Sequence, residues 1–217
     1  MAALADIDSA AAETALEAFG AFHAEPGDAL PEWCGTLVLL APREPGFWPA
    51  FTASREYRDG RPDPLDRWSE RVIGGLARAF EAEALFPFGG PPYRPFLRWA
   101  ERSGRAWPSP VGLLVHDTAG LMVSYRGALA LAGRLALPTP PARPCESCAE
   151  KPCLSACPAD ALTAKGYDVP ACKAYLETSA GSACHDGGCA VRRACPVSAR
   201  HGRRAEQSAF HMRAFHR

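Results

Sequence analysis

Eight cysteines are concentrated in the last third of this 217-residue chain, and thiols at this density are suited to binding a shared group. The first half of the segment reads C-x2-C-x4-C-x3-C-P, and the second half reads C-x11-C-x4-C-x5-C-P. Disulfides rarely persist in a reducing compartment, so the chemistry to consider first is metal binding. The eight residues are Cys145, Cys148, Cys153, Cys157, Cys172, Cys184, Cys189 and Cys195.

The spacing favours two iron–sulfur clusters. Ferredoxins with two [4Fe–4S] clusters use C-x2-C-x2-C-x3-C-P, in which the cysteine before proline ligates the other cluster. Proline suits the start of a short helix, here PADAL (158–162), because the first helical turn leaves its N–H unpaired anyway. Applied to this chain, the crossing rule predicts one set of Cys145, Cys148, Cys153 and Cys195. The other set is then Cys172, Cys184, Cys189 and Cys157.

Zinc is the main alternative. Cross-braced zinc modules also use eight ligands arranged in C-x2-C pairs. They do not require a Cys-Pro ending, whereas both halves of this segment have one. The spacings are longer than in ferredoxins, so zinc and a single or incomplete cluster stay open. The ninth cysteine, Cys34, stands alone on an apolar stretch and is interpreted as a small buried residue.

Apolar periodicity predicts the elements upstream of the cysteines. A helical pattern covers residues 9–23, and a short apolar run predicts a buried strand over 35–42. The Pro- and Gly-rich stretch 43–64 is expected to be a loop with at most a short helix. Further expectations are a helix over 63–83, a helix over 96–104, a hairpin of 111–116 and 121–125 around the turn DTAG, a strand beginning at 128, and a linker over 137–144.

Charge and hydropathy limit the classes of partner. Residues 1–140 carry 13 Arg against 17 acids, a net of −4, and residues 141–217 carry 11 basic against 7 acidic groups, a net of +4. The formal net charge is therefore zero, so we expect no nucleic-acid partner. The acidic N-terminus does not resemble a signal peptide, and no apolar stretch is long enough for a membrane helix. We therefore expect a cytoplasmic protein that does not bind a membrane.

Several motifs resemble known families. The stretch CPADALTAKGYDVPACKAYLET (157–178) is similar to the ferredoxin half of epoxyqueuosine reductase, and residues 86–131 are similar to the segment that lines its corrinoid site. DPLDRW (63–68) and VGLLVH (111–116) resemble the cobalamin-processing CblC family. The resemblance implies an α+β fold with two domains. Residues 1–138 would form a nitroreductase-like, CblC-like domain with an antiparallel sheet and flanking helices, and residues 139–217 a bacterial-ferredoxin-like domain with a basic tail.

The resemblance also implies a redox function. Electrons from a donor such as a flavodoxin or ferredoxin would pass through two [4Fe–4S] clusters to a cobalamin bound by the N-terminal domain. The implied pocket walls are Pro108, Ser109, Gly120 and Tyr125. Such a protein would be a cobalamin-dependent or cobalamin-reducing oxidoreductase. The alternative is an electron-transfer module without a corrinoid that docks a partner protein.

Two departures argue against epoxyqueuosine reduction itself. The acidic residue proposed as proton donor in that family aligns here with the segment Phe88-Gly89-Gly90-Pro91, which has no acid. The family's Trp-x-Gly-Lys loop becomes Trp107-Pro108-Ser109-Pro110 and loses its lysine. No residue of this chain is therefore assigned a catalytic role.

Overall fold

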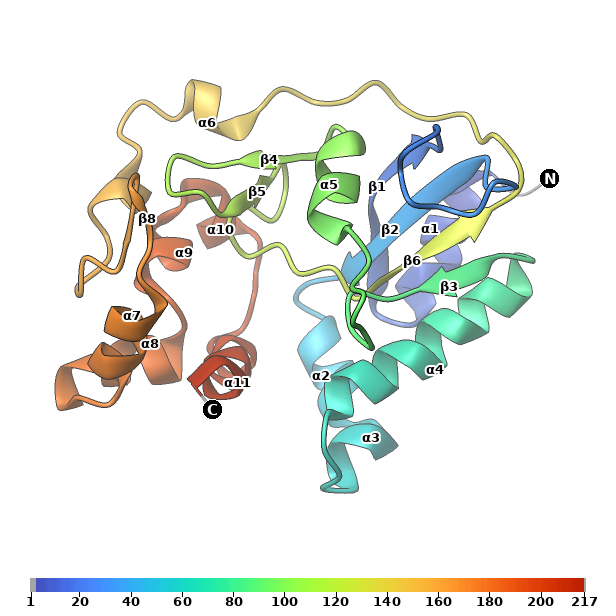
Figure 1. The fold of residues 1–217 in the computed structure, drawn as a ribbon. Helices are drawn as coiled ribbons and strands as arrows, with labels where there is room; N and C mark the ends of the chain where they lie inside the picture. The colour runs from blue at the N-terminus through green and yellow to red at the C-terminus, as the bar shows by residue number, and fades with distance from the viewer. Residues whose placement is uncertain (1–2, 217) are drawn as a thin grey trace. The chain divides into compact units, whose positions relative to one another are not determined.

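The apolar run between Gly35 and Arg43 forms the central strand of the main sheet, as predicted. In the computed structural model, which describes residues 3–216, every residue of β2 (Thr36–Pro42) is buried. Strand β2 pairs antiparallel with β1 (Leu16–His23) and β6 (Gly127–Leu131), and β6 pairs antiparallel with β3 (Glu83–Leu85). The sheet therefore has the order β1-β2-β6-β3 (Figure 1). With its flanking helices it makes the fold α+β.

The expected helix over residues 9–23 is wrong in its second half. Helix α1 (Leu4–Glu13) ends early, Ala15 adopts a φ of 60°, and the chain then enters β1. A bulge between Ala18 and Ala21 shifts the register of β1 against β2. Because the bulge breaks the two-residue alternation of the strand, the buried residues Leu16, Phe19 and Phe22 fall three apart and imitate a helix.

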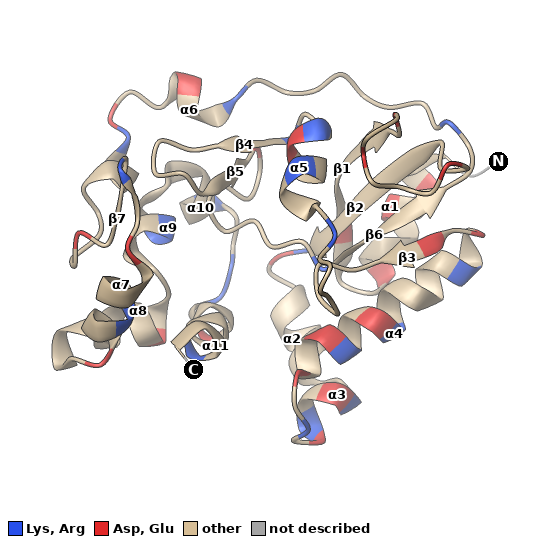
Figure 2. Cartoon of the chain, in the orientation of Figure 1, with Lys and Arg blue, Asp and Glu red and all other residues tan. Residues whose placement is uncertain are grey.

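Helix α4 (Pro64–Ala79) confirms most of the helix expected over 63–83, but it ends at Ala79 and Glu83 begins strand β3. Proline occupies the first turn of the helix, where the missing N–H costs no hydrogen bond. Its apolar residues at helical spacing, among them Trp68, Val72 and Leu76, are buried, and α4 contacts β3 and β6. The exposed residues of α4 include both acids and bases, which are coloured along the helix in Figure 2.

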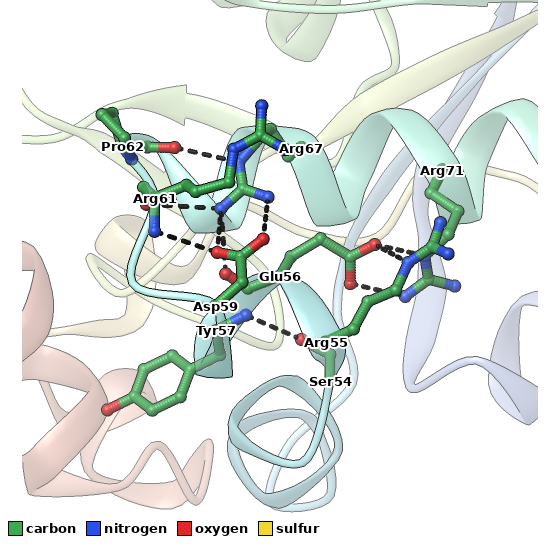
Figure 3. A network of polar contacts seen from close by, with 9 residues as sticks. All are labelled: Ser54, Arg55, Glu56, Tyr57, Asp59, Arg61, Pro62, Arg67 and Arg71. Carbon is green, nitrogen blue, oxygen red and sulfur yellow. Dashed lines mark hydrogen bonds and ion pairs between the residues drawn. The ribbon is translucent and has the colours of Figure 1, made fainter.

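The stretch predicted to be a loop contains two short helices, α2 (Phe47–Thr52) and α3 (Arg55–Arg58). The ring of Phe47 meets Trp68 edge-on at 5.3 Å between centroids, and this contact holds α2 against α4. A polar network joins α3 to α4 (Figure 3). In it, the buried Glu56 accepts two hydrogen bonds from Arg71, and the Arg71 guanidinium lowers the pKa of Glu56 to about 2.

Helix α5 (Phe96–Arg102) confirms the helix predicted after the proline-rich connection. Trp99 is fully buried and donates a hydrogen bond from Nε1 to the carbonyl of Asp28 at 2.7 Å. Arg102 donates to the carboxylate of the same Asp28 at 3.1 Å. These bonds attach α5 to the loop before β2.

The predicted pairing of residues 111–116 with residues 121–125 in a hairpin is wrong. The turn DTAG does close tightly, with mutual backbone hydrogen bonds between His116 and Gly120. Beyond Gly120 the chain leaves the strand direction, and β5 (Leu114–His116) instead pairs with β4 (Ala106–Pro108). His116 is fully buried and its Nδ1 accepts from the N–H of Thr118, which holds the chain in the turn and away from a second strand.

The contacts divide the chain into two units that differ from the expected boundary at residue 138. The first unit comprises Met1–Arg105 with Ser124–Pro141, and the second comprises Ala106–Val123 with Ala142–Arg217. The β4–β5 hairpin thus belongs with the cysteine-rich segment. Residues 134–143 form no helix or strand, in agreement with the predicted linker.

The cysteine-rich unit is built from short elements. The predicted helix over 158–162 is wrong: Pro158 starts a turn that stops at Asp160, whose φ is 49°. The matching Cys-Pro of the second half does start a helix, α10 (Pro196–Arg200), with proline in its first turn. The other elements are α6 (Pro144–Ser147), η1 (Pro152–Leu154), β7 (Leu162–Thr163), β8 (Gly166–Tyr167), α7 (Val169–Leu176), η2 (Ser179–Gly181), α8 (Ser182–Gly187), α9 (Ala190–Ala194) and α11 (Ala205–His216).

Candidate metal centre

The first cysteine group consists of Cys145, Cys148, Cys153 and Cys195. Cys145 lies in α6, Cys148 follows it, Cys153 lies in η1, and Cys195 joins α9 to α10. Burial raises the pKa of the Cys145 thiol, and the charges of Cys153, Cys195 and Cys148 raise it further. The pKa of Cys153 is raised by burial and then by Cys195 and Cys148. Cys145 and Cys153 are therefore both influenced by Cys195 and Cys148.

The second cysteine group consists of Cys157, Cys172, Cys184 and Cys189. Cys172 and Cys184 lie in α7 and α8, and Cys189 precedes α9. Burial raises the pKa of Cys172, and Cys189, Cys157 and Cys184 raise it further. The assignment of the eight cysteines to two crossed clusters stays a prediction.

All nine cysteines are free thiols. Among residues 3–216, no group of three or more His, Cys, Asp or Glu side chains converges closely enough to hold one metal ion. Thiolates around a single zinc lie about 4 Å apart, given Zn–S bonds of about 2.3 Å and tetrahedral angles. In an iron–sulfide cube each cysteine binds a different iron, so its ligands need not converge on one point.

An apolar cluster contacts cysteines of both groups, among them Cys145, Cys157 and Cys189. Cys153 and Cys195 belong to one buried cluster with residues of the β4–β5 segment and of the cysteine-rich segment. This packing excludes water from the two thiols and places the hairpin beside them. The apolar members of the cluster are Val111, Val115, Leu121, Leu162 and Val191.

Gly120 brings the turn of the hairpin close to Cys195 of this group. It has a φ of 56°, and a Cβ at this position would lie 2.5 Å from the Ser198 nitrogen and 3.0 Å from the Cys195 sulfur. The next N–H, that of Leu121, donates to the buried Ser198 hydroxyl at 2.8 Å. Only glycine allows the turn to lie this close to α10.

The second group has polar neighbours that the cysteine spacing does not reveal. Burial raises the pKa of Tyr167, and the neighbouring Cys172 raises it further. Burial lowers the pKa of Arg192, while the nearby Cys189 and Tyr167 oppose that shift. The Arg192 guanidinium also donates to the carbonyl of Leu121. Arg192 is therefore partly buried and fixed in place, unlike the exposed Arg193 beside it.

The four predicted corrinoid walls fall in different units. Pro108 is exposed in β4 and Gly120 lies against Ser198, both in the second unit, whereas Tyr125 belongs to the first unit and meets Phe19 edge-on at 6.5 Å. Ser109, in the second unit, is 8 % exposed, and its hydroxyl has no hydrogen-bond partner among the described residues. A buried hydroxyl without a hydrogen-bond partner lowers the stability of the fold unless a ligand supplies that partner.

A cavity in the first unit lies instead along the proline-rich connection. Its volume is about 580 Å³, which is within the range of small-molecule sites. Phe86 and Phe88 stack in its wall at 5.2 Å, and the guanidinium of the buried Arg126 lies over the Phe88 ring at 5.5 Å. Arg126 is held by Asp66 and Ser69 of α4. The cavity is lined by Ala29, Glu83, Ala84, Leu85, Phe86, Phe88, Gly89, Pro92, Tyr93, Arg94 and Pro95.

Comparison of the chain with models of protein families, with characterised proteins and with solved structures finds no match. Within residues 3–216, no helix combines the length and the hydrophobicity needed to cross a membrane.

Proposed function

We propose that this protein is an iron–sulfur electron carrier that binds two [4Fe–4S] clusters. The observation that supports the proposal best is the mutual influence of the free thiols: in addition to burial, Cys195 and Cys148 raise the pKa of Cys145 and Cys153, and Cys189, Cys157 and Cys184 raise the pKa of Cys172. On the crossing rule these thiols form two groups of four. Each group takes three cysteines from one half of the segment and the cysteine before proline from the other half. Two-cluster ferredoxins share this crossed pattern, and a cross-braced zinc module does not require it.

The donor set fits the proposed group. Thiolates are the ligands that iron–sulfur clusters use, and none of these thiols is consumed in a disulfide. When bound, such clusters supply one-electron transfer at low potential. The chain contributes apolar packing against cysteines of both groups and a close backbone approach at Gly120. We place the protein in the cytoplasm, where thiols stay reduced.

The proposed electron acceptor is a corrinoid. Supporting observations are the resemblance of residues 86–131 to a corrinoid-lining segment, the unpartnered hydroxyl of Ser109, and the aromatic cavity along residues 83–95. On this proposal the first unit is nitroreductase-like and the second ferredoxin-like. The segment Phe88-Gly89-Gly90-Pro91 has no acid to deliver a proton, so we do not propose epoxyqueuosine as substrate.

A second candidate is an electron-transfer module that docks an acidic redox partner, such as a flavodoxin or ferredoxin donor. The second unit has exposed arginines that favour it: Arg193, Arg200, Arg204 and Arg213. Charge of this kind accelerates encounter with an acidic protein, and the effect weakens as salt rises.

Titration of anaerobically purified, dithionite-reduced protein with cob(II)alamin tests the acceptor. Oxidation of the protein with matching formation of cob(I)alamin in the visible spectrum supports the corrinoid proposal. If dithionite reduces the protein but the spectrum of the cobalamin does not change, the result favours the electron-transfer module that docks a partner. Protein that dithionite cannot reduce contradicts both.

A further inference from the structure

Helix α11 packs on the elements that carry three cysteines of the second group. It lies side by side with α8 (Figure 1). Its buried residues include Gln207, Ser208 and Ala209. Residues 201–204, which connect α10 to α11, form no helix or strand. Helix α11 is therefore a separate element, and its packing can be altered without changing a cysteine.

The last turn of α11 is attached next to the part of α7 that carries Cys172. The ring of Phe215 stacks on Tyr167 of β8 at 6.1 Å between centroids. The ammonium of Lys173, the residue after Cys172, lies 5.6 Å from the centroid of the same Phe215 ring. Aromatic stacking and a cation near an aromatic ring are both favourable, so Phe215 holds α11 against β8 and α7.

A second contact lies beside Cys184. The residue after it in α8, His185, meets the ring of His216 edge-on at 5.9 Å between centroids. The Nε2 atom of His216 also lies 3.8 Å from Oε1 of Glu177, which follows α7. The end of α11 thus contacts both α7 and α8.

The third contact is a close approach of α11 to the backbone before Cys189. A Cβ at the buried Gly188 would lie 2.6 Å from the Cβ of Ser208 in α11. Gly188 has a φ of 89°, which glycine adopts readily, and its N–H donates to the Cys184 carbonyl at 3.0 Å. A side chain at Gly188 would therefore push α11 away from the segment that joins Cys184 to Cys189.

These contacts accompany limited exposure of the three cysteines. Cys184 is buried, and Cys172 and Cys189 are half-buried. The protein shell around a metal centre controls how readily solvent reaches it. Local opening of one packed element is easier than unfolding of the whole unit. The strength of the α11 contacts can therefore set how often solutes reach this group.

We propose that α11 is a cover that limits the access of water and solutes to the second cysteine group. The inference rests on the proposed function, because it requires a cluster at this group. It gives α11 no ligand to the cluster, and movement of the cover breaks no covalent bond.

Iron release to an excess of the ferrous-iron chelator 2,2′-bipyridine tests the inference. The full-length protein is purified without oxygen and kept reduced with dithionite, and each cluster is followed by electron paramagnetic resonance. The signal that Cys172→Ala lacks is assigned to the second group. Phe215→Ala should speed the loss of that signal about tenfold, because it removes the stacking and cation contacts that hold α11. The other signal should decay at the wild-type rate.

Two variants of the same helix are the controls. Phe215→Tyr keeps the ring and should retain the wild-type rates, and Arg213→Ala changes an exposed residue of α11 and should alter neither signal. Phe215→Leu keeps an apolar side chain, so it decides the test if Phe215→Ala does not fold, and a smaller acceleration of the same signal is expected.

Wild-type decay of the second signal in the folded Phe215 variants, or equal acceleration of both signals, overturns the inference alone. Protein without iron overturns the proposed function together with it.

Discussion

Cys157 belongs to the first half of the cysteine segment by sequence and to the second group by position. Its charge acts on Cys172, which lies in the other half. The spacing C-x3-C-P suggests this separation, and Cys195 in turn influences the pKa of Cys145 and Cys153. At this scale the sequence predicts the cysteine groups, and their assignment to clusters stays a prediction. The contacts of Tyr167 and Arg192 could not be predicted, because they arise only once α7, α9 and the hairpin have packed.

Replacing Cys157 with Ala should disturb the cluster of Cys172, Cys184 and Cys189 and leave the other intact. The expected protein retains about half its iron and shows one of the two resonance signals. Cys34→Ala is the control, because Cys34 is buried in the first unit and belongs to neither group. If Cys157→Ala instead removes the resonance signal of the cluster assigned to Cys145, Cys148, Cys153 and Cys195, the crossed assignment is contradicted.

Replacing Glu56 with Gln should destabilise the first unit by about 2 kcal/mol at pH 7, because it breaks a buried, charge-assisted pair with Arg71. Urea unfolding followed by tryptophan fluorescence measures the loss. Glu70→Gln, on the exposed side of α4, should change little.

The cost of Glu56→Gln should also depend on pH. The folded-state pKa of Glu56 is about 2, below the ordinary value of 4.5. The stabilisation is therefore fully present above pH 4.5 and is lost as the pH falls toward 2. The free energies of unfolding of the wild type and the variant should therefore converge as the pH falls from 4.5 toward 2. If their difference stays constant over this range, the role given to Glu56 is contradicted.

At the scale of elements, a helix or strand could be predicted where its apolar residues follow a single regular period. Strand β2 and helix α4 follow apolar runs with a single periodicity, and both were predicted. Strand β1 was misread because its bulge imitates helical spacing. The hairpin was assigned the wrong partner because β4 is three residues long and contains Pro108, so no pattern marks it as a strand. The hairpin segment is attached to α10 by the hydrogen bond from Leu121 to Ser198, two residues that lie 77 positions apart in the sequence.

Replacing Gly120 with Ala tests that attachment. A side chain at Gly120 meets the Ser198 backbone and is strained by the positive φ, so we expect a loss of about 3 kcal/mol and a lower iron content. Gly112→Ala is the matched control, since Gly112 has a φ of 76° but no atom within 4 Å of the added Cβ. It should cost only about 1 kcal/mol. If the two variants lose the same amount of unfolding free energy, the packing of the hairpin on α10 is contradicted.

At the scale of the molecule, the two units are expected to differ in their dependence on metal. The first unit has a sheet and a continuous apolar core, whereas the second is assembled from short helices around cysteines. Removal of iron by a chelator should therefore make residues 142–217 sensitive to protease and leave α4 and the sheet protected, because metal binding and folding are coupled. Protease resistance of the second unit without metal contradicts this expectation.

Analysis of iron, acid-labile sulfide and zinc in protein purified without oxygen tests the central claim most directly. Two clusters of four irons and four sulfides predict about eight of each per chain and little zinc. Two zinc ions per chain with no sulfide would contradict the account, from the crossed cysteine groups to the proposed electron transfer.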